Sequence, residues 1–349
     1  MSDDSGMTPV RVLCNADWFE GRTIGGRGVA VRRLVESGWA APLRNLVAWW
    51  RSDVAVFNIA TRQLMVLAAA RALLPFSRCR LVLVDTILNR PQTWRQRLRV
   101  RLMRRLLHEV DLFILYFRDT EALQRVYAIP AAKIRYVPFK VNDFANVVKA
   151  PVTDAGYILA CGRSKRDYVT FARAMDGLPY RATILVPKAE EARVHGTNSD
   201  LAGLPPNVAV VQDDGSSRSW IEWISRASFV VLPILPDTLA PSGIGTYLAA
   251  MALGKCVVIT EGLATRGLLD SSTAVLVPPA DAAALRAAVV RVADDRAFRE
   301  RVAAAGRDYA RGLGDVSRLA GDIIHEVEVL LTGRETANGT SLHLGGSAR

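Results

Sequence analysis

Short apolar runs alternate with helix-like segments along the second half of the chain. The apolar runs are rich in Val and Ile, and they occupy Tyr157–Ala160, Ala182–Val186, Val208–Val211, Phe229–Leu232, Val257–Thr260 and Ala274–Val277. Segments with helical spacing lie between them, at Tyr168–Met175, Trp220–Ala227 and Thr246–Leu253. Continuous apolar strands that alternate with helices predict a parallel sheet covered on both faces.

The first half of the chain repeats this pattern less regularly. Its predicted strands are Val10–Cys14, Val54–Asn58, Leu81–Asp85, Leu112–Tyr116 and Ile134–Val137. A glycine-rich loop spans Gly21–Gly28, and Val29–Ser37 is predicted to form the helix that follows it. The simplest architecture is α/β, with two doubly wound domains joined near residues 140–155.

The length of 349 residues also fits two domains, at about 100–200 residues per domain. We expect an N-terminal domain over 1–145 and a C-terminal domain over 152–312. An amphipathic helix over 313–332 follows, and it could cross back to the N-terminal domain. The tail over 333–349 is rich in Gly, Ser and Thr and is expected to be disordered.

The composition is that of a globular protein, with 50% hydrophobic and 23% charged residues. No apolar run reaches the roughly 18–20 residues that a membrane-spanning helix needs, and the start of the chain lacks the apolar stretch of a secretory signal. The cysteines lie far apart in the sequence, so they predict neither a disulfide framework nor a zinc site. A cytoplasmic protein with reduced thiols is the expected class.

The net charge of +11 is unevenly distributed. Residues 1–150 contain 24 Lys and Arg against 12 Asp and Glu, whereas residues 151–349 contain 21 against 22. A charge concentrated in one half indicates that a polyanionic surface faces that half. Nucleic acid and an anionic membrane are the two candidates, and the chain contains no recognised nucleic-acid motif.

Much of this charge lies in the segment Trp94–His108. Six arginines fall within 11 residues that contain no acid: Arg95, Arg97, Arg99, Arg101, Arg104 and Arg105. An apolar residue also recurs every fourth position, at Trp94, Leu98, Leu102 and Leu106. One interpretation is a surface helix that packs on the sheet through this stripe, with its arginines in water. The other is docking on anionic lipid headgroups, worth about 1 kcal/mol per basic residue.

Four segments carry a resemblance to a known family. Thr246–Val258 and Ala274–Asp281 resemble the helix, strand and Pro-Pro-Asp of the donor-binding half of family 4 glycosyltransferases (glycosyl transferases group 1). Gly162–Arg163 and Gly25–Gly28 resemble the family's Gly-Arg and Gly-Gly turns. The resemblance is strong over 155–310 and implies a divergent member with the GT-B fold, in which two Rossmann-like domains face a cleft. It also implies a nucleotide-diphosphate sugar as donor, retention of anomeric configuration, and neither a metal nor another cofactor.

Breaking a sugar–phosphate bond places negative charge on the leaving phosphate, which cations, loop N–H groups and helix N-termini stabilise. The resemblance and this chemistry together predict the site residues. Arg163 and Lys165 are the predicted catalytic cations, and Asp85, at a strand end, is a predicted base or sugar-hydroxyl anchor. The predicted donor-binding residues are Gly25, Gly26, Arg166, Ser242, Gly243, Ile244, Gly245 and Thr246.

One departure from the family pattern bears on activity. The family usually has two glutamates eight positions apart, and Pro241 and Ala249 stand there in this chain. The second glutamate normally holds the donor ribose, so that contact must come from elsewhere, with Asp237 as one candidate. Either the chain is an active, divergent member that uses Ser242–Gly245, or it no longer transfers sugar.

The predicted function is transfer of a sugar from a nucleotide-diphosphate donor to a glycan or lipid-linked acceptor, in polysaccharide or glycolipid biosynthesis. The enzyme is expected at the inner face of the plasma membrane as a peripheral protein. A first alternative is a non-catalytic sugar-nucleotide-binding or scaffold protein of the same fold. A second alternative, binding of nucleic acid, is disfavoured by the lack of interleaved aromatic residues.

Overall fold

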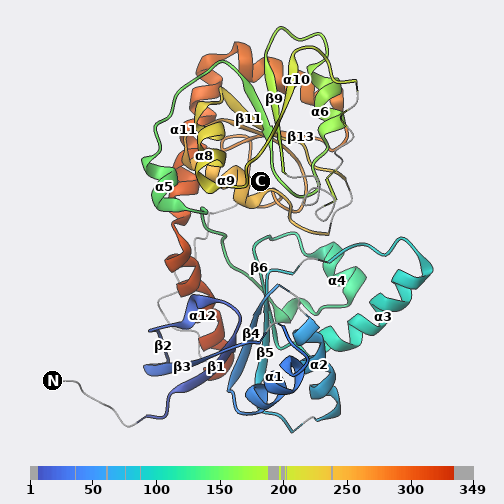
Figure 1. The fold of residues 1–349 in the computed structure, drawn as a ribbon, viewed down its shortest axis with the longest axis vertical. Coiled ribbons are helices and arrows are strands. Elements are labelled where there is room, and N and C mark those ends of the chain that lie inside the picture. The colour runs from blue at the N-terminus through green and yellow to red at the C-terminus, as the bar shows by residue number, and fades with distance from the viewer. Residues whose placement is uncertain are drawn as a thin grey trace, which may run out of the picture.

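The computed structural model describes residues 7–333, apart from 36, 60–61, 75, 87, 188–195, 198–200, 202 and 237–238. Two parallel sheets, each flanked by helices, lie one above the other (Figure 1). Within the described residues, the N-terminal sheet has strand order β2-β3-β1-β4-β5-β6-β7, and the C-terminal sheet has order β10-β9-β8-β11-β12-β13. The predicted α/β architecture of two doubly wound domains is therefore confirmed. Asp237 lies outside the described residues.

The N-terminal domain follows the predicted strands closely. Its strands are β1 (Val10–Cys14), β2 (Thr23–Ile24), β3 (Arg27–Arg33), β4 (Val54–Asn58), β5 (Arg80–Val84), β6 (Leu112–Leu115) and β7 (Ile134–Tyr136). Its helices are η1 (Asp17–Phe19), α1 (Ala41–Trp50), α2 (Arg62–Leu73), α3 (Trp94–His108), α4 (Glu121–Tyr127) and η2 (Ala131–Lys133). Strand side chains alternate between the two faces, and helices cover both faces.

The C-terminal domain has the same design. Its strands are β8 (Ile158–Cys161), β9 (Ala182–Val186), β10 (Val208–Gln212), β11 (Phe229–Leu232), β12 (Val257–Thr260) and β13 (Val275–Val277). Its helices are α6 (Tyr168–Met175), α8 (Ser217–Arg226), α9 (Ile244–Ala252), α10 (Ala282–Asp294) and α11 (Arg296–Leu313). The strand order reverses beside β8, which is where open α/β sheets form a crevice for ligands.

The chain passes between the domains twice. The first connection contains α5 (Phe144–Lys149), and the second leads from α11 into α12 (Val316–Thr332). A hydrogen bond of 3.1 Å from the backbone N–H of Val141 to the carbonyl of Gly314 joins the two connections. Helix α12 then packs its buried face, which includes Ile323, against the N-terminal sheet on the side of Val12 and Val56.

The segment after the glycine-rich loop is a strand, so the helix predicted over Val29–Ser37 is wrong. Strand β3 pairs in parallel with β1, with Val10 opposite Val29. The two valines of β3, Val29 and Val31, alternate with other residues, and this period of two suits a strand better than a helix. Gly25 and Gly26, with φ angles of 57° and 74°, form the two-residue turn of the β2–β3 hairpin.

The basic helix is confirmed as α3, but of the predicted stripe Leu106 alone packs against the core. Trp94, Leu98 and Leu102 are 70%, 59% and 59% exposed. The helix instead packs on the sheet through Val100 and Leu107. These two residues are seven positions apart and lie on the face opposite the stripe, so the stripe faces solvent. In the part of the chain that the structure describes, no helix has both the length and the apolarity to cross a membrane.

Candidate functional site

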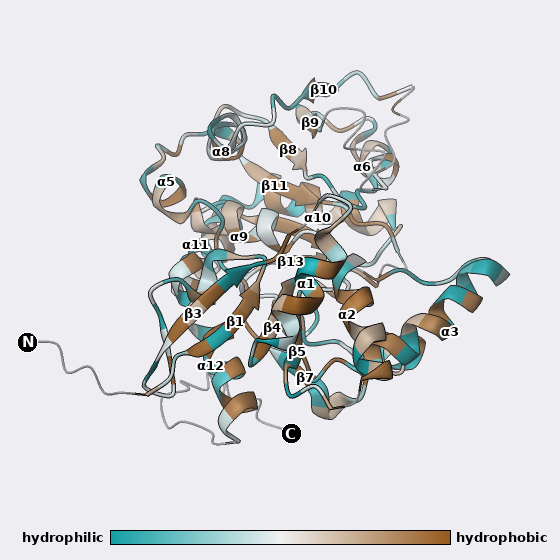
Figure 2. Cartoon of the chain, turned by 60° about the horizontal axis from the view of Figure 1, so that its bottom comes forward, coloured by the Kyte–Doolittle hydropathy of each residue, from teal (hydrophilic) through white to brown (hydrophobic). Residues whose placement is uncertain are grey.

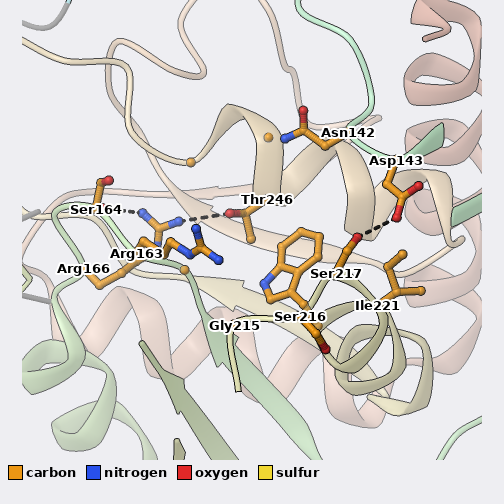
Figure 3. A pocket seen from close by; sticks show the side chains of 14 residues that line it. Asn142, Asp143, Arg163, Ser164, Arg166, Gly215, Ser216, Ser217, Ile221 and Thr246 are labelled. Carbon is orange, nitrogen blue, oxygen red and sulfur yellow. Dashed lines mark hydrogen bonds between the residues drawn. The ribbon is translucent and has the colours of Figure 1, made fainter. Parts of the chain in front are cut away.

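A pocket of about 370 Å³, called pocket A, lies at the carboxyl ends of the C-terminal strands. It is lined by the connection between the domains, the β8–α6 loop, the start of α8 and the start of α9. The lining residues are Asn142, Asp143, Gly162, Arg163, Ser164, Arg166, Gly215, Ser216, Ser217, Trp220, Ile221, Gly243, Gly245 and Thr246. Figure 3 shows Arg163 and Arg166 at one end of the pocket and Asp143 with Ser217 at the other.

Arg166 is a buried cation at the wall of pocket A. It is 1% exposed, and its guanidinium donates to the carbonyls of Cys161 and Ser164 at 2.8 and 2.6 Å. Its Nη2 also lies 3.3 Å from the hydroxyl oxygen of Thr246. Among the described residues it forms no ion pair, and burial lowers its pKa. A buried charge without a counter-ion is costly, so an anion in pocket A would be strongly favoured there.

Hydrogen bonds to its backbone carbonyls hold the loop that carries Arg166 in place. Gly162, at φ 121°, gives the guanidinium room, because a Cβ atom at this position would overlap Arg166. The carbonyl of Lys165 accepts a hydrogen bond of 2.9 Å from the N–H of Leu235, and the carbonyl of Arg163 accepts one of 2.5 Å from the hydroxyl of Thr197. Arg163 is exposed at the pocket and Lys165 is half-buried. Arg163 and Arg166 thus both line pocket A, whereas Lys165 does not.

The amino end of α9 forms another wall of pocket A. Gly243 is the N-cap residue with φ 104°, and Gly245 lies so close to the interdomain connection that a Cβ atom would be 2.8 Å from Nδ2 of Asn142. First-turn N–H groups of a helix lack acceptors within the helix, so they favour an anion. The side chain of Ile244 is buried, so this residue offers only its backbone. The helix begins at Ile244, two residues before the predicted start.

The opposite end of pocket A contains polar residues that the sequence analysis missed. The hydroxyl of Ser217 donates a hydrogen bond of 2.6 Å to Oδ2 of Asp143. Asp143 also accepts a bond of 2.8 Å from Nδ2 of Asn146 through its other oxygen. Asp143 belongs to the interdomain connection, and Ser217 opens α8. No local sequence pattern marks these two residues as a pair. They meet because the interdomain connection passes beside the start of α8.

A second pocket, pocket B, has a volume of about 590 Å³ and contains residues of both domains. Asp85, Asn89 and Tyr116 come from the N-terminal domain, whereas Lys165 and Ser242–Gly245 come from the C-terminal domain. It shares Asn142, Ser164, Gly243 and Gly245 with pocket A. A molecule in pocket A can therefore extend directly into pocket B.

Asp85 is the acid of pocket B. It directly follows β5 and has φ 51°, a left-handed conformation that Asp tolerates better than most residues. Burial raises its pKa to about 6. Burial, with a smaller contribution from the charge of Asp85, also raises the pKa of Tyr116. A carboxylate with a pKa near neutrality can accept a proton or a strong hydrogen bond from a sugar hydroxyl.

The predicted glycines of the first half are not part of either pocket. Gly25 and Gly26 precede β3, which runs parallel to β1, so they lie at the amino end of the sheet. Asp85 lies at the opposite, carboxyl end. The neighbour that a Cβ atom on Gly25 would meet is Thr332 of α12, at 3.8 Å. The structure therefore does not bring this turn to the other predicted site residues.

Pro241 and Ala249 stand where the family usually has its two glutamates. Ala249 is fully buried in α9, where Tyr247 and Leu248 are also buried, and Pro241 lies at the rim of pocket B. Neither can supply a carboxylate to a ligand. Within the described ranges, no three His, Cys, Asp or Glu side chains gather in a group that could hold a metal ion.

Residues 181–295 match the family model described as Glycosyl transferases group 1. The match covers the part of the C-terminal domain that contributes α8 and α9 to the pockets. None of the curated proteins matches the chain by sequence.

Solved structures resemble the whole architecture at low identity. HepE from Anabaena, in complex with UDP, has a TM-score of 0.64 at 13% identity and covers 92% of this chain and 99% of its own. Sucrose-phosphate synthase from Thermosynechococcus elongatus has a TM-score of 0.63 at 16% identity, with 94% and 100% covered. The E. coli trehalose-6-phosphate structure with UDP-2-fluoro glucose has a TM-score of 0.58 at 14% identity, with 83% and 78% covered.

The chain has the GT-B fold. The two parallel-sheet domains match those of the GT-B glycosyltransferase structures over most of both chains. In this GT-B chain, pockets A and B occupy the cleft between the domains, where both sheets end their strands.

Proposed function

We propose that this protein is a glycosyltransferase that takes a sugar from a nucleotide-diphosphate donor bound in pocket A. The observation that carries the proposal is Arg166, a buried guanidinium beside the amino end of α9 that pairs with no carboxylate of the described residues. A diphosphate there would supply the missing negative charge. The group 1 match over 181–295 and the UDP complexes of HepE support the same ligand class.

The catalytic role of the site is stabilisation of the leaving diphosphate. Arg163 would add a second cation in pocket A, and Thr246 a hydroxyl. Lys165, on the same loop, would add a cation from the adjoining pocket B. Positive groups fixed in advance around a developing charge lower the barrier to its formation without reorganisation. Retention of anomeric configuration and independence of a metal belong to the proposal through the family 4 resemblance.

The nucleoside would occupy the other end of pocket A. With Ala249 in place of the family's ribose-binding glutamate, we assign the ribose contact to Asp143 and Ser217. Their side chains already form a hydrogen-bonded pair at the pocket, and a carboxylate accepts two further hydrogen bonds readily. Trp220 also lines this end and offers a ring against which a base can pack.

The acceptor would lie in pocket B, beside Asp85. This carboxylate would act as base or as anchor for a sugar hydroxyl. The acceptor class that we propose is a glycan or a lipid-linked glycan, in polysaccharide or glycolipid biosynthesis. The arginines of α3 support a peripheral position on an anionic membrane.

The second candidate function is a non-catalytic sugar-nucleotide-binding or scaffold protein. It is favoured by one observation, the replacement of both family glutamates by Pro241 and Ala249. Release of sugar from a nucleotide sugar by the purified protein, as hydrolysis or transfer, would exclude it. Donor binding without any turnover across a panel of acceptors would support it.

Thermal denaturation against a panel of nucleoside diphosphates and nucleotide sugars tests the donor site. A ligand at 100 times its Kd adds about 2.7 kcal/mol to the stability of the folded protein. We expect one nucleotide class to stabilise the wild type, and Arg163→Ala and Lys165→Ala to reduce that shift. If no nucleotide stabilises the wild type, the proposed donor site is wrong.

A further inference from the structure

Helices α1, α2 and α3 carry exposed apolar side chains on their outer surfaces. On α3, Trp94, Leu98 and Leu102 form the stripe that faces solvent. On α1, Leu43 is 64% exposed and Trp50 is 56% exposed. These two residues are seven positions apart and therefore share one face of their helix.

The apolar surface continues on α2. Leu73, in the last turn of this helix, is 81% exposed, and Phe76, just beyond it, is 84% exposed. Val66, seven positions before Leu73, is also exposed. Single exposed apolar residues are normal, but a large group of them marks an interaction site.

The three helices are neighbours on one face of the N-terminal sheet. Helix α1 contacts α2, and α2 contacts α3. Their inner sides pack in one core with the sheet, whereas α12 covers the other face of the same sheet. Figure 2 shows apolar residues along all three helices, with α3 extending outward from the domain. The outer sides of α1, α2 and α3 thus form one surface, called here the α1–α3 surface.

This surface is strongly basic. The segments Ala41–Trp50 and Trp94–His108 together contain seven exposed arginines and no Asp or Glu. The six arginines of α3 are all exposed, and they flank the apolar stripe. The guanidinium of Arg95 lies 5.3 Å from the ring centre of Trp94, so charge and apolar surface are adjacent.

We propose that the α1–α3 surface docks on an anionic lipid bilayer, with its apolar side chains in the interfacial layer and its arginines on the headgroups. Apolar residues next to basic ones, with no acid between them, are typical of such interfacial surfaces. A second copy of the chain would place arginines against arginines, which is unfavourable. Nucleic acid would match the charge but would leave the exposed Trp, Phe and Leu side chains without a function.

Docking through this surface also orients the cleft. The chain from Asp85 to Trp94 runs from pocket B to the start of α3, and Asn89 lies on this path at the wall of pocket B. A lipid-linked acceptor anchored in the bilayer beside Trp94 would therefore have its sugar near Asp85. This last step rests on the proposed function, whereas docking itself does not.

Flotation of the full-length protein with vesicles tests docking. We expect binding to vesicles of phosphatidylcholine with 30% phosphatidylglycerol and none to pure phosphatidylcholine vesicles. The pairs Leu98→Gln/Leu102→Gln on α3 and Leu43→Gln/Trp50→Gln on α1 should each weaken binding at least tenfold. The triple variant Arg95→Gln/Arg99→Gln/Arg101→Gln should weaken it about a hundredfold.

The matched controls are Val210→Gln in β10 and Val316→Gln in α12, whose side chains are also exposed but lie outside the surface. Both should bind vesicles as the wild type does. If Leu43→Gln/Trp50→Gln binds vesicles as strongly as the wild type does, the proposed three-helix surface is wrong. It is also wrong if the protein is a dimer in solution that Leu98→Gln/Leu102→Gln dissociates. Stabilisation by the nucleotide that the panel identifies, measured on the same variants, should be unchanged. If no nucleotide of the panel stabilises the wild type, the result tells against the donor site and not against docking.

Discussion

The guanidinium of Arg166 lies against the α-carbon of Gly162, in the space that a Cβ atom of residue 162 would occupy. Gly162→Ala therefore has to displace the buried cation of pocket A, and it also places Ala at φ 121°. Strain of this kind costs about 1–3 kcal/mol, in addition to the lost contacts of Arg166. We expect a lower melting temperature together with loss of stabilisation by nucleoside diphosphates.

The control for this variant is Gly177→Ala. Gly177 also has a positive φ, of 68°, but a Cβ atom there would meet nothing within 4 Å. It should lower the melting temperature through backbone strain alone and leave the nucleotide-induced shift intact. If Gly162→Ala keeps the full nucleotide-induced shift, Arg166 is not part of the donor site.

Asp143 provides a test of the nucleoside contact. Asp143→Asn should weaken binding of a ribonucleoside diphosphate about tenfold, because a charge-assisted hydrogen bond to a ribose hydroxyl is lost. The same variant should bind the 2′,3′-dideoxy nucleotide as the wild type does, because that ligand cannot form the bond. Isothermal titration with both nucleotides measures the difference.

Asn146→Ala is the matched control for Asp143→Asn. It removes the other hydrogen-bond partner of Asp143, at 2.8 Å, but Asn146 does not line pocket A. We expect it to preserve the discrimination between ribose and dideoxyribose. Equal loss of affinity for both nucleotides in Asp143→Asn would mean that this residue supports the connection and does not touch the ribose.

A half-buried ion pair between Asp111 and Arg71 in the N-terminal domain gives a prediction about stability. Burial alone would raise the pKa of Asp111, but hydrogen bonds and charge attraction from Arg71, together with the N–H of Leu81, lower it below its ordinary value. This stabilisation is present at neutral pH and is lost as the pH falls below about 4. Asp111→Asn should therefore be less stable than the wild type at pH 7 by about 1–3 kcal/mol, and the difference should shrink in acid. A constant difference over pH 3–7 would contradict the ion-pair origin.

The central strands of both sheets could be predicted because they are buried apolar runs rich in Val, Ile and Leu. Val54–Asn58 and Val257–Thr260 have the predicted bounds, since no other element type suits such short apolar runs. The segment Arg27–Arg33 was mispredicted because a glycine-rich loop before it suggested a helix, although its alternating valines favour a strand. Local periodicity was the better guide there.

The site was predictable only where one loop or one helix end contains it. Arg163, Lys165, Arg166 and the start of α9 are each local in sequence, and the structure brings them together. The pairing of Asp143 with Ser217 depends on a connection that crosses between domains, over 74 residues of sequence. The direction of the α3 stripe was mispredicted because Val100 and Leu107 have helical spacing too. Periodicity cannot tell which of two apolar faces meets the sheet.

The raised pKa of Asp85 makes a prediction about stability that depends on pH. Its pKa of about 6 in the folded protein lies above the ordinary value of an unfolded chain, near 3.8. Below about pH 4 the carboxyl is protonated in the folded and the unfolded state, so its ionisation does not change the stability there. As the pH rises from about 4 to about 6, the unfolded state ionises first and the wild type loses stability. Asp85→Asn has no such charge, so it should gain up to about 3 kcal/mol relative to the wild type over this interval.

The same residue should set the pH dependence of turnover. Asp85 would accept a proton or a hydroxyl hydrogen bond in its ionised form. The rate of sugar release by the wild type should therefore increase as the pH rises through about 6. Asp85→Asn should lose most of the activity and the increase of the rate near pH 6. Its affinity for the donor nucleotide in pocket A should stay within about twofold of that of the wild type. Unfolding by urea at several pH values and initial rates of sugar release measure the two effects. A variant with the wild-type pH profile would remove Asp85 from the mechanism, even if its stability changed as expected.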